Sequence, residues 1–263
     1  MAGPRLLFST AAFFARPLER SLPLIAECGY AGVEIMVTKD PASQDPELMR
    51  RLAERYGLRI EAIHAPSLLL TRAVWGADPV GKIDRAILVA AEAGIPLVVT
   101  HPPYRWQRGY RRWLRDELAE AEGRSGITVA IENMFPLHVG SHPLMLHANQ
   151  DLEDLKDIPH LVLDTSHAGV ARHDLVKVRR LFGKRLRHVH LSDNAGRGWD
   201  SHLPPGEGVL PLEPFVDDLV ASGFSGTVSL EVDLRRYLTE PPRLHDVMTG
   251  MRERLEERLG RSP

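Results

Sequence analysis

Cysteine is nearly absent from this sequence: Cys28 stands alone among 263 residues. A single cysteine excludes an internal disulfide framework and a cysteine-rich zinc site. Any bound metal would therefore be held by histidine, aspartate and glutamate side chains. The scarcity of cysteine also fits a reducing compartment, and we expect a cytoplasmic protein.

The chain also lacks a dominant charge and a long apolar run. It has 33 Lys and Arg against 35 Asp and Glu, a net charge of -2, which gives no global attraction for nucleic acid or anionic membranes. No stretch is long and apolar enough to span a membrane. The opening MAGPRLLFSTAAFFARP resembles a secretory signal, because Arg5 precedes an apolar run. Ser9 and Thr10 interrupt that run and no small-residue cleavage site precedes Arg16, so we interpret Leu6–Ser9 as a first β-strand.

Short runs rich in Val, Ile and Leu alternate with longer segments of helical periodicity. The eight predicted strands are Arg5–Ser9, Gly32–Val37, Arg59–His64, Leu97–His101, Ile127–Asn133, Leu161–His167, Leu186–Asp193 and Thr227–Asp233. The predicted helices are Pro17–Cys28, Pro46–Tyr56, Pro79–Ala93, Gly109–Glu122, His142–Lys156, Ala168–Phe182, Pro211–Ser222 and Pro241–Leu259. Eight such units without a break in composition predict a single (β/α)8 TIM-barrel domain over residues 1–263.

Polar residues recur where the predicted strands end. They are His64, His101, Glu132, Asp164, His167, His190 and Glu231. In a TIM barrel these ends converge on one face, where active sites lie. Carboxylates and imidazoles buried together there would be costly unless a divalent ion neutralised them, so we predict a metal site. His188 shares a strand face with His190, which makes one a candidate ligand and the other a supporting or substrate-contacting group.

Other polar residues have simpler interpretations. Glu34 and Glu61 lie within predicted strands, where a carboxylate commonly pairs with Lys or Arg. The loop Leu191–Gly208 has almost no apolar residues to hold it in place. We predict that Asp200 and His202 anchor it as metal ligands in the same barrel mouth.

The motifs IHAP, IENM, LDTSHAG, HVHLSD, DSH followed by PGEG, and SLEVD occur in this order. Their order resembles that of the xylose-isomerase-like TIM barrels, which include endonuclease IV and many sugar or sugar-phosphate isomerases and epimerases. In endonuclease IV relatives, the resemblance implies a three-metal cluster on His64, His101, Glu132, Asp164, His167, His190, Asp200, His202 and Glu231. In the epimerase branch, it implies a single divalent metal on Glu132, Asp164, His190 and Glu231, with both glutamates moving protons on opposite sides of the substrate carbon.

Two activities therefore compete on one scaffold. A metal-dependent isomerase or epimerase would use Glu132 and Glu231 as acid and base, with His167 and His188 positioning substrate oxygens. An endonuclease would cleave phosphodiesters at abasic DNA sites with clustered zinc ions. The first is our prediction, with one to three zinc or manganese ions and a sugar or sugar phosphate as substrate. A barrel that keeps metal only for stability is a third reading.

Two segments bear on this choice. Ser67 follows HAP where endonuclease IV relatives carry an aromatic residue, and the segment MVTKDPAS lacks their arginine pattern. The segment Pro103–Glu117 interleaves arginines with Tyr104, Trp106, Tyr110 and Trp113, which would suit phosphates and stacked bases. We expect instead an amphipathic helix whose aromatic residues pack on the barrel. Arg105 or Arg108 would alternatively bind a substrate phosphate.

Overall fold

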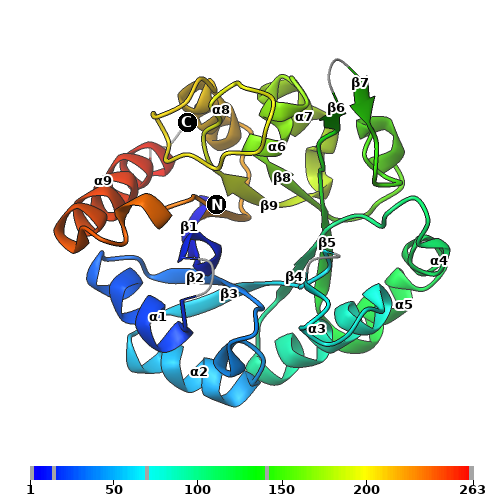
Figure 1. Cartoon of the computed structure of the whole chain (residues 1–263), viewed down its shortest axis with the longest axis horizontal. Coiled ribbons are helices and arrows are strands. Elements are labelled where there is room, and N and C mark those ends of the chain that lie inside the picture. Colours follow the sequence, from blue (N-terminus) through cyan, green and yellow to red (C-terminus); the bar gives the residue numbers. More distant parts are fainter. Residues whose placement is uncertain (1–2, 14–15, 69–70, 140–141, 261–263) are drawn as a thin grey trace.

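The main sheet closes into a barrel. The computed structural model describes residues 3–13, 16–68, 71–139 and 142–260. Eight parallel strands neighbour one another in the order β1, β10, β9, β8, β5, β4, β3, β2, and β2 pairs with β1 (Figure 1). Their bounds are β1 (Arg5–Ser9), β2 (Gly32–Met36), β3 (Arg59–His64), β4 (Leu97–Thr100), β5 (Thr128–Glu132), β8 (Leu161–Asp164), β9 (Leu186–Leu191) and β10 (Thr227–Leu230). The predicted TIM barrel is confirmed.

Helices cover the outer wall of this barrel (Figure 1). They are α1 (Leu18–Glu27), α2 (Pro46–Arg55), α3 (Pro79–Ala93), α4 (Arg108–Asp116), α5 (Leu118–Ser125), α6 (Thr165–Val170), α7 (Leu175–Phe182), α8 (Leu212–Ala221) and α9 (Pro241–Leu259). The carboxylates of Asp45 and Asp174 accept backbone hydrogen bonds at the start of α2 and α7. Gly94, with φ of 70°, adopts the left-handed conformation that ends α3. No helix of the described residues is both long and apolar enough to cross a membrane.

The helix predicted over His142–Lys156 is wrong. This part of the chain instead contributes to an antiparallel hairpin and a short 3-10 turn: β6 (Leu137–Val139), β7 (His142–Leu144) and η4 (Leu152–Leu155). The Arg105 N–H donates to the Leu146 carbonyl, and the Ala148 N–H donates to the Pro103 carbonyl. Because these backbone groups pair with a segment distant in sequence, they are not available to a helix.

Two other predicted helices are each divided in two. The segment Gly109–Glu122 contains all of α4 except its first residue and the first part of α5, and the two helices meet at Glu117. The segment Ala168–Phe182 spans α6 and α7. Helix α6 begins earlier than predicted, because the Asp164 carboxylate accepts a hydrogen bond from the His167 N–H at 2.6 Å and caps α6 directly after β8.

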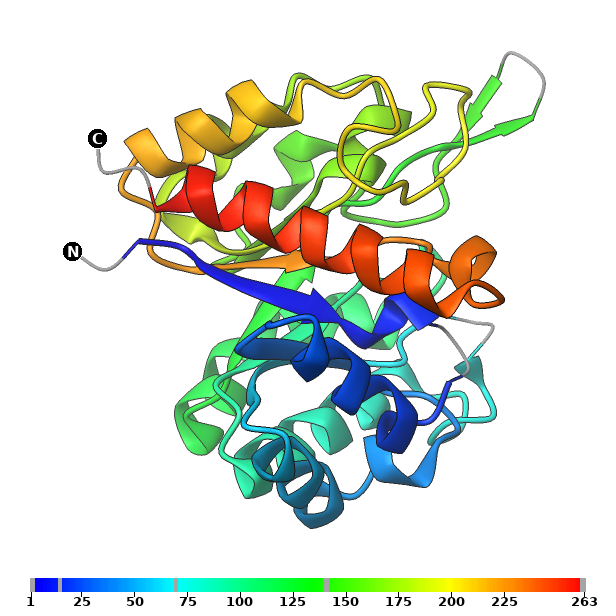
Figure 2. The same cartoon turned by 90° about the vertical axis from the view of Figure 1, so that its left-hand side faces the viewer.

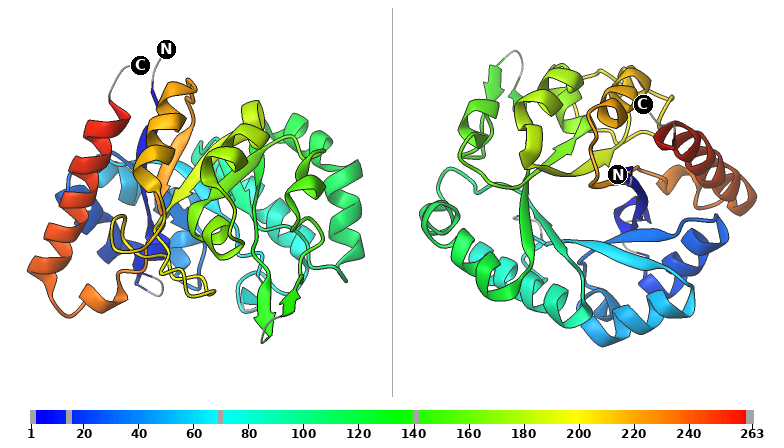
Figure 3. Two further views of the ribbon diagram at one scale, coloured as in Figure 1. Left: turned by 90° about the horizontal axis from the view of Figure 1, so that it is seen from above. Right: turned by 180° about the vertical axis from the view of Figure 1, so that it is seen from behind.

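The barrel has one elaborated end. The strands run towards the end where the loop between β9 and α8 and the β6–β7 hairpin lie, whereas β1 begins and α9 ends at the opposite end (Figures 2 and 3). Part of the barrel interior is filled by a small apolar group: Ala62, Leu97, Val99, Ala130 and Val162. The polar residues at the strand ends therefore sit above a packed floor, at the mouth where TIM-barrel active sites lie.

Candidate metal centre

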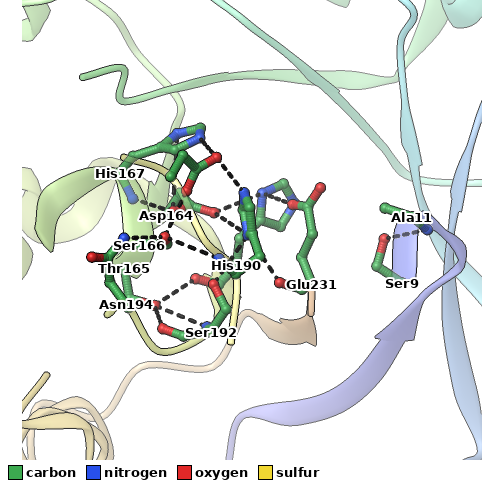
Figure 4. A network of polar contacts seen from close by, with 12 residues as sticks. Ser9, Ala11, Asp164, Thr165, Ser166, His167, His190, Ser192, Asn194 and Glu231 are labelled. Carbon is green, nitrogen blue, oxygen red and sulfur yellow. Dashed lines mark hydrogen bonds and ion pairs between the residues drawn. The ribbon is translucent and has the colours of Figure 1, made fainter. Parts of the chain in front are cut away.

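All nine predicted ligands come together at the mouth. His64, Glu132 and Asp164 end their strands, and Glu231 directly follows β10. The remaining five are His101, His167, His190, Asp200 and His202. The close-up shows Asp164, His167, His190 and Glu231 pointing toward one another from separate elements (Figure 4). Residues from the ends of six strands, the start of α6 and one loop thus form one cluster, as the barrel topology predicts.

A central group of four has the arrangement of a metal site. Glu132, Asp164, His190 and Glu231 each offer one ligand atom, and these atoms lie within 4.8 Å of one another. His190 Nδ1 is 2.7 Å from Glu231 Oε2, 3.3 Å from Glu132 Oε1 and 3.8 Å from Asp164 Oδ2. One oxygen of each carboxylate is buried and accepts no well-formed hydrogen bond from the described residues: Glu132 Oε2, Asp164 Oδ2 and Glu231 Oε2. The polar atoms nearest to these oxygens are histidine ring nitrogens. Buried oxygens of this kind fit a divalent cation, which would satisfy them together.

In the part of the chain that the structure describes, histidines, and not lysine or arginine, surround these carboxylates. Among the described residues, the ion-pair partners of Glu132, Asp164 and Glu231 are all histidines. Three negative groups thus share a site without lysine or arginine, which is expensive in a buried environment. The donor set, three carboxylates and one imidazole, suits zinc or manganese.

The histidine rings around this group are held in the tautomer that a ligand needs. His64 Nδ1 lies 3.2 Å from the Ala65 carbonyl, and His167 Nδ1 lies 2.9 Å from the Asn133 carbonyl. A carbonyl oxygen only accepts, so Nδ1 carries the proton in both rings and the neutral ring has its lone pair on Nε2. His64 Nε2 faces Glu132 Oε2 at 3.4 Å. Two acceptors facing each other require a proton or a metal between them.

His202 is oriented by the same principle. Its Nδ1 is 3.0 Å from the Glu231 carbonyl, and its Nε2 is 2.7 Å from Asp200 Oδ2. The same Asp200 oxygen is 3.3 Å from His167 Nε2. His167, His202 and Asp164 form a further group of possible ligands, and His64, His101 and Glu132 form another. The mouth thus offers ligand atoms for more than one ion.

Without metal, these groups control one another's protonation. Burial opposes charge on His202, but Asp200 and Asp164 outweigh it and raise the pKa of His202 to about 10. Burial raises the pKa of Asp164 to about 6, against the opposing effect of His167 and His202. Burial also lowers the pKa of His101 to about 3, so that ring is neutral at ordinary pH. A metal ion binding here would replace protons held on the other histidines.

Ser67 contributes to the mouth in a way the sequence did not reveal. The His101 N–H donates to Ser67 Oγ at 3.2 Å, and the same hydroxyl lies 3.0 Å from His101 Nδ1. His101 Nε2 is 3.4 Å from Glu132 Oε2. Ser67 therefore fixes the ring of His101 and does not reach outward as an aromatic side chain would.

Glu34 is the buried charge that our sequence interpretation missed. We expected Glu34 and Glu61 to pair with Lys or Arg. Glu61 does, at 3.2 Å from Arg5 and 3.5 Å from Arg59. Glu34 is fully buried and instead contacts His190 and His188. The period-two position of Glu34 in β2 was visible in the sequence, but its partners come from β9, across the barrel.

His188 lies behind His190, not in the open mouth. It is fully buried, with Nδ1 2.6 Å from Thr227 Oγ1 and Nε2 3.5 Å from Glu34 Oε2. Of the two roles left open for this residue, the geometry favours support of His190 over direct contact with a substrate.

The loop between β9 and α8 has an anchor that we did not predict. Asp193 is buried, and its carboxylate accepts hydrogen bonds from four backbone N–H groups, those of Asn194, Gly206, Gly208 and Leu210. At Gly208, a Cβ atom would lie 2.3 Å from both the Asn194 carbonyl and Asp193 Oδ1, so only glycine fits. The loop therefore has an anchor that does not depend on a metal ion.

A cavity opens beside the cluster. It has a volume of about 250 Å³ and is lined by Asp200, His202 and Glu231 together with Met36, Asp233 and Arg235, among others. Asp233 holds Arg235 at its rim through a two-point contact, with Nε 2.8 Å from Oδ1 and Nη2 2.5 Å from Oδ2. The cavity is slightly smaller than ordinary ligand pockets, which begin at about 300 Å³, and would suit a small molecule.

The arginine-rich segment after β4 packs largely as expected. Tyr110 and Trp113 of α4 are buried, which supports the interpretation as an amphipathic helix. Trp106 is 57% exposed and stacks on Tyr104, with ring centroids 4.9 Å apart. Tyr104 in turn stacks on the buried His147 at 4.3 Å. Three of the four aromatic residues are therefore buried, and only Trp106 is exposed.

The fold and the site together define a TIM barrel with a buried histidine and carboxylate centre at its mouth. Residues 22–254 match the family model described as xylose isomerase-like TIM barrel, and the chain belongs to this family. A protein of Mycobacterium leprae is 35% identical over 246 residues, covering 85% of this chain and 87% of that protein. Fructoselysine 3-epimerase of Shigella flexneri is 26% identical, covering 86% and 88%. The crystal structure of a D-tagatose 3-epimerase-like protein superposes with a TM-score of 0.69 at 23% identity, covering 97% and 99%.

Proposed function

We propose that this protein is a metal-dependent isomerase or epimerase of a sugar or sugar phosphate. The observation that carries the proposal is the central group Glu132, Asp164, His190 and Glu231, with three buried carboxylate oxygens that accept no well-formed hydrogen bond from any described residue. Similarity to fructoselysine 3-epimerase along most of both chains supports it. The cavity beside Glu231 is of a size for a small molecule.

The four residues of the central group would hold a divalent ion, zinc or manganese. When bound, such an ion would polarise a substrate carbonyl and make the hydrogen on the neighbouring carbon more acidic. This explains why three carboxylates are buried here without lysine or arginine.

Glu132 and Glu231 would transfer the proton. Both carboxylates approach the same His190 Nδ1 from different strands, Glu132 from β5 and Glu231 from the end of β10. A substrate carbon between them would meet one carboxylate on each side, one as base and the other as acid. Asp164 and His190 would serve as ligands without taking part in the transfer.

His167 would position substrate oxygens. Its ring is fixed by the Asn133 carbonyl, and its Nε2 lies 3.3 Å from Oδ2 of Asp200, a residue that lines the cavity. A ring held at one nitrogen by the backbone presents the other in a defined direction, which favours a single substrate pose.

A second candidate is an endonuclease-like phosphodiesterase acting at abasic DNA sites. The observation that favours it is the pair of additional ligand groups, His64 with His101 and Glu132, and Asp164 with His167 and His202. Such an enzyme would use up to three zinc ions. Against it, Ser67 turns inward to His101, and Tyr110 and Trp113 are buried in the core and cannot stack on bases.

One assay separates the two. Metal-loaded protein is offered ketoses, aldoses and their phosphates in heavy water, and in parallel a duplex with an abasic site. We expect metal-dependent incorporation of deuterium into at least one sugar. Metal-dependent nicking of the duplex, without deuterium in any sugar, would replace the first proposal by the second. A barrel that binds metal only for stability would neither exchange deuterium into a sugar nor nick the duplex. Substitution of Glu132 and Glu231 would then change no activity.

A further inference from the structure

A carboxylate lies deep in the barrel, beneath the proposed metal centre. Glu34 of β2 has no measurable exposure, and among the described residues its ion-pair partners are the two histidines of β9. Burying a carboxylate without lysine or arginine is costly, so its contacts must compensate for the loss of hydration. Those contacts are directed at one ring in particular.

The strong contact of Glu34 is with His190. Glu34 Oε1 lies 2.9 Å from His190 Nε2, a good hydrogen-bond distance. Glu34 Oε2 is 3.5 Å from His188 Nε2, at the outer limit. His188 is itself fixed on its other side, because Nδ1 lies 2.6 Å from Thr227 Oγ1 of β10. Three strands thus contribute to a line of side chains, Thr227, His188, Glu34 and His190, that ends at the centre.

This line determines which nitrogen of His190 faces the carboxylates. An ionised carboxylate only accepts, so the hydrogen of the neutral ring lies on Nε2 and points to Glu34. The lone pair is then on Nδ1, which is directed at Glu231, Glu132 and Asp164. In the opposite tautomer, Nδ1 would carry a hydrogen and bind no metal. A carboxylate behind the ring also strengthens the opposite nitrogen as a ligand.

We propose that Glu34 is a positioning residue for the metal ligand His190, and that His188 and Thr227 hold Glu34 in place. The inference rests on the proposed metal dependence. It assigns a purpose to two polar side chains buried inside the barrel, Glu34 and His188, at positions that bulky apolar side chains usually fill. Glu34 does not touch the substrate, and acts through the orientation and strength of His190.

The test measures metal affinity directly. Metal-free wild type and Glu34→Gln are titrated with Co²⁺ by calorimetry, and the visible absorption of bound Co²⁺ is recorded. Gln keeps the shape and one acceptor but removes the charge, and its amide can turn a donor toward Nε2. We expect Co²⁺ affinity to fall about 10- to 100-fold, as is usual when such outer partners are lost. The Co²⁺ spectrum should also change, because the nitrogen ligand is weakened or rotated.

Glu61→Gln is the matched control. Glu61 is also a strand carboxylate, in the neighbouring β3, but it pairs with Arg5 and Arg59 away from the centre. We expect wild-type affinity and an unchanged spectrum. His188→Gln is a milder second variant, which leaves the Glu34 to His190 contact in place and should lower affinity several-fold. It also keeps the proposal testable if Glu34→Gln does not fold.

The outcomes separate the two proposals. Wild-type affinity and spectrum in Glu34→Gln, or in His188→Gln if the first variant is unfolded, would overturn the positioning role while metal dependence stands. An equal loss in Glu61→Gln would also overturn it, because the effect would then be a general one on the barrel. If wild-type protein binds no Co²⁺, Mn²⁺ or Zn²⁺, the proposed function fails, and the positioning role fails with it.

Discussion

Replacing Asp193 by Asn should destabilise the protein through the loop between β9 and α8. Oδ1 of Asp193 accepts from Asn194 N–H at 2.8 Å and from Leu210 N–H at 2.9 Å. Oδ2 accepts from Gly206 and Gly208 N–H, each at 3.0 Å. An amide group keeps one oxygen and replaces the other by an NH2 group. In either orientation, two backbone donors therefore lose their acceptor and face another donor.

The size of this effect follows from burial. Asp193 is 1% exposed, so water cannot take the place of the lost oxygen. Leaving a buried donor unsatisfied costs about 1–3 kcal/mol, so two such groups give a loss of about 2–6 kcal/mol. Urea unfolding of wild type and Asp193→Asn measures the difference. Hydrogen exchange at Gly206 and Gly208 shows whether the loop is where it arises.

The control for this experiment is Asp116→Asn. Asp116 makes a two-point contact with the neighbouring Arg115 on the surface, and the substitution should leave the unfolding midpoint unchanged. A loss below about 1 kcal/mol for Asp193→Asn, with normal protection at Gly206 and Gly208, would refute the reasoning, because at least one unsatisfied donor costs that much. Since the same loop carries Asp200 and His202, we also expect weaker metal binding in Asp193→Asn.

Further predictions address the centre and its surroundings. Glu132→Gln or Glu231→Gln, checked for metal content, should abolish deuterium exchange into the substrate; exchange at the wild-type rate in a metal-loaded variant would contradict the proton-transfer role. Chelated protein should lose thermal stability as pH rises from about 6.5 to about 10. Burial opposes charge on His202, but Asp200 and Asp164 raise its folded-state pKa from 6.5 to about 10, so its stabilising contribution is fully present below the unfolded-state pKa and is lost as pH rises through the folded-state pKa. A melting temperature that rises over this range would contradict the prediction. Gly208→Ala should disorder the loop, because its Cβ would overlap the Asn194 carbonyl; unchanged exchange protection across 193–210 would show that the loop adjusts. On chelation of wild type, residues 197–202 should exchange faster, whereas Gly206 and Gly208 stay protected by Asp193; equal protection with and without metal would show that Asp200 and His202 do not depend on an ion.

The sequence by itself determined the barrel and the composition of its mouth. Apolar runs of strand length alternate with amphipathic segments, and this alternation can be seen in the sequence without knowing which strands pair. His64, Glu132, Asp164 and His190 were recognisable because parallel strands bring their carboxyl ends to one face. Position relative to a strand end is a local property, so a linear pattern was sufficient to locate these side chains.

The tertiary structure decided what depends on contacts between distant segments. His142–Leu144 pairs with β6, and residues 146–148 pair with the segment after β4, so hydrogen bonds to other segments overruled the helical periodicity of this part of the chain. Glu34 and Glu61 are both strand carboxylates in the sequence, yet one faces histidines across the barrel and the other faces arginines near its rim. The role of Asp193 arises only when four backbone groups of the returning loop reach its carboxylate. The partner of a buried charge is set by the fold, because strand pairing and loop closure, not neighbours in the chain, determine which groups lie within hydrogen-bond distance.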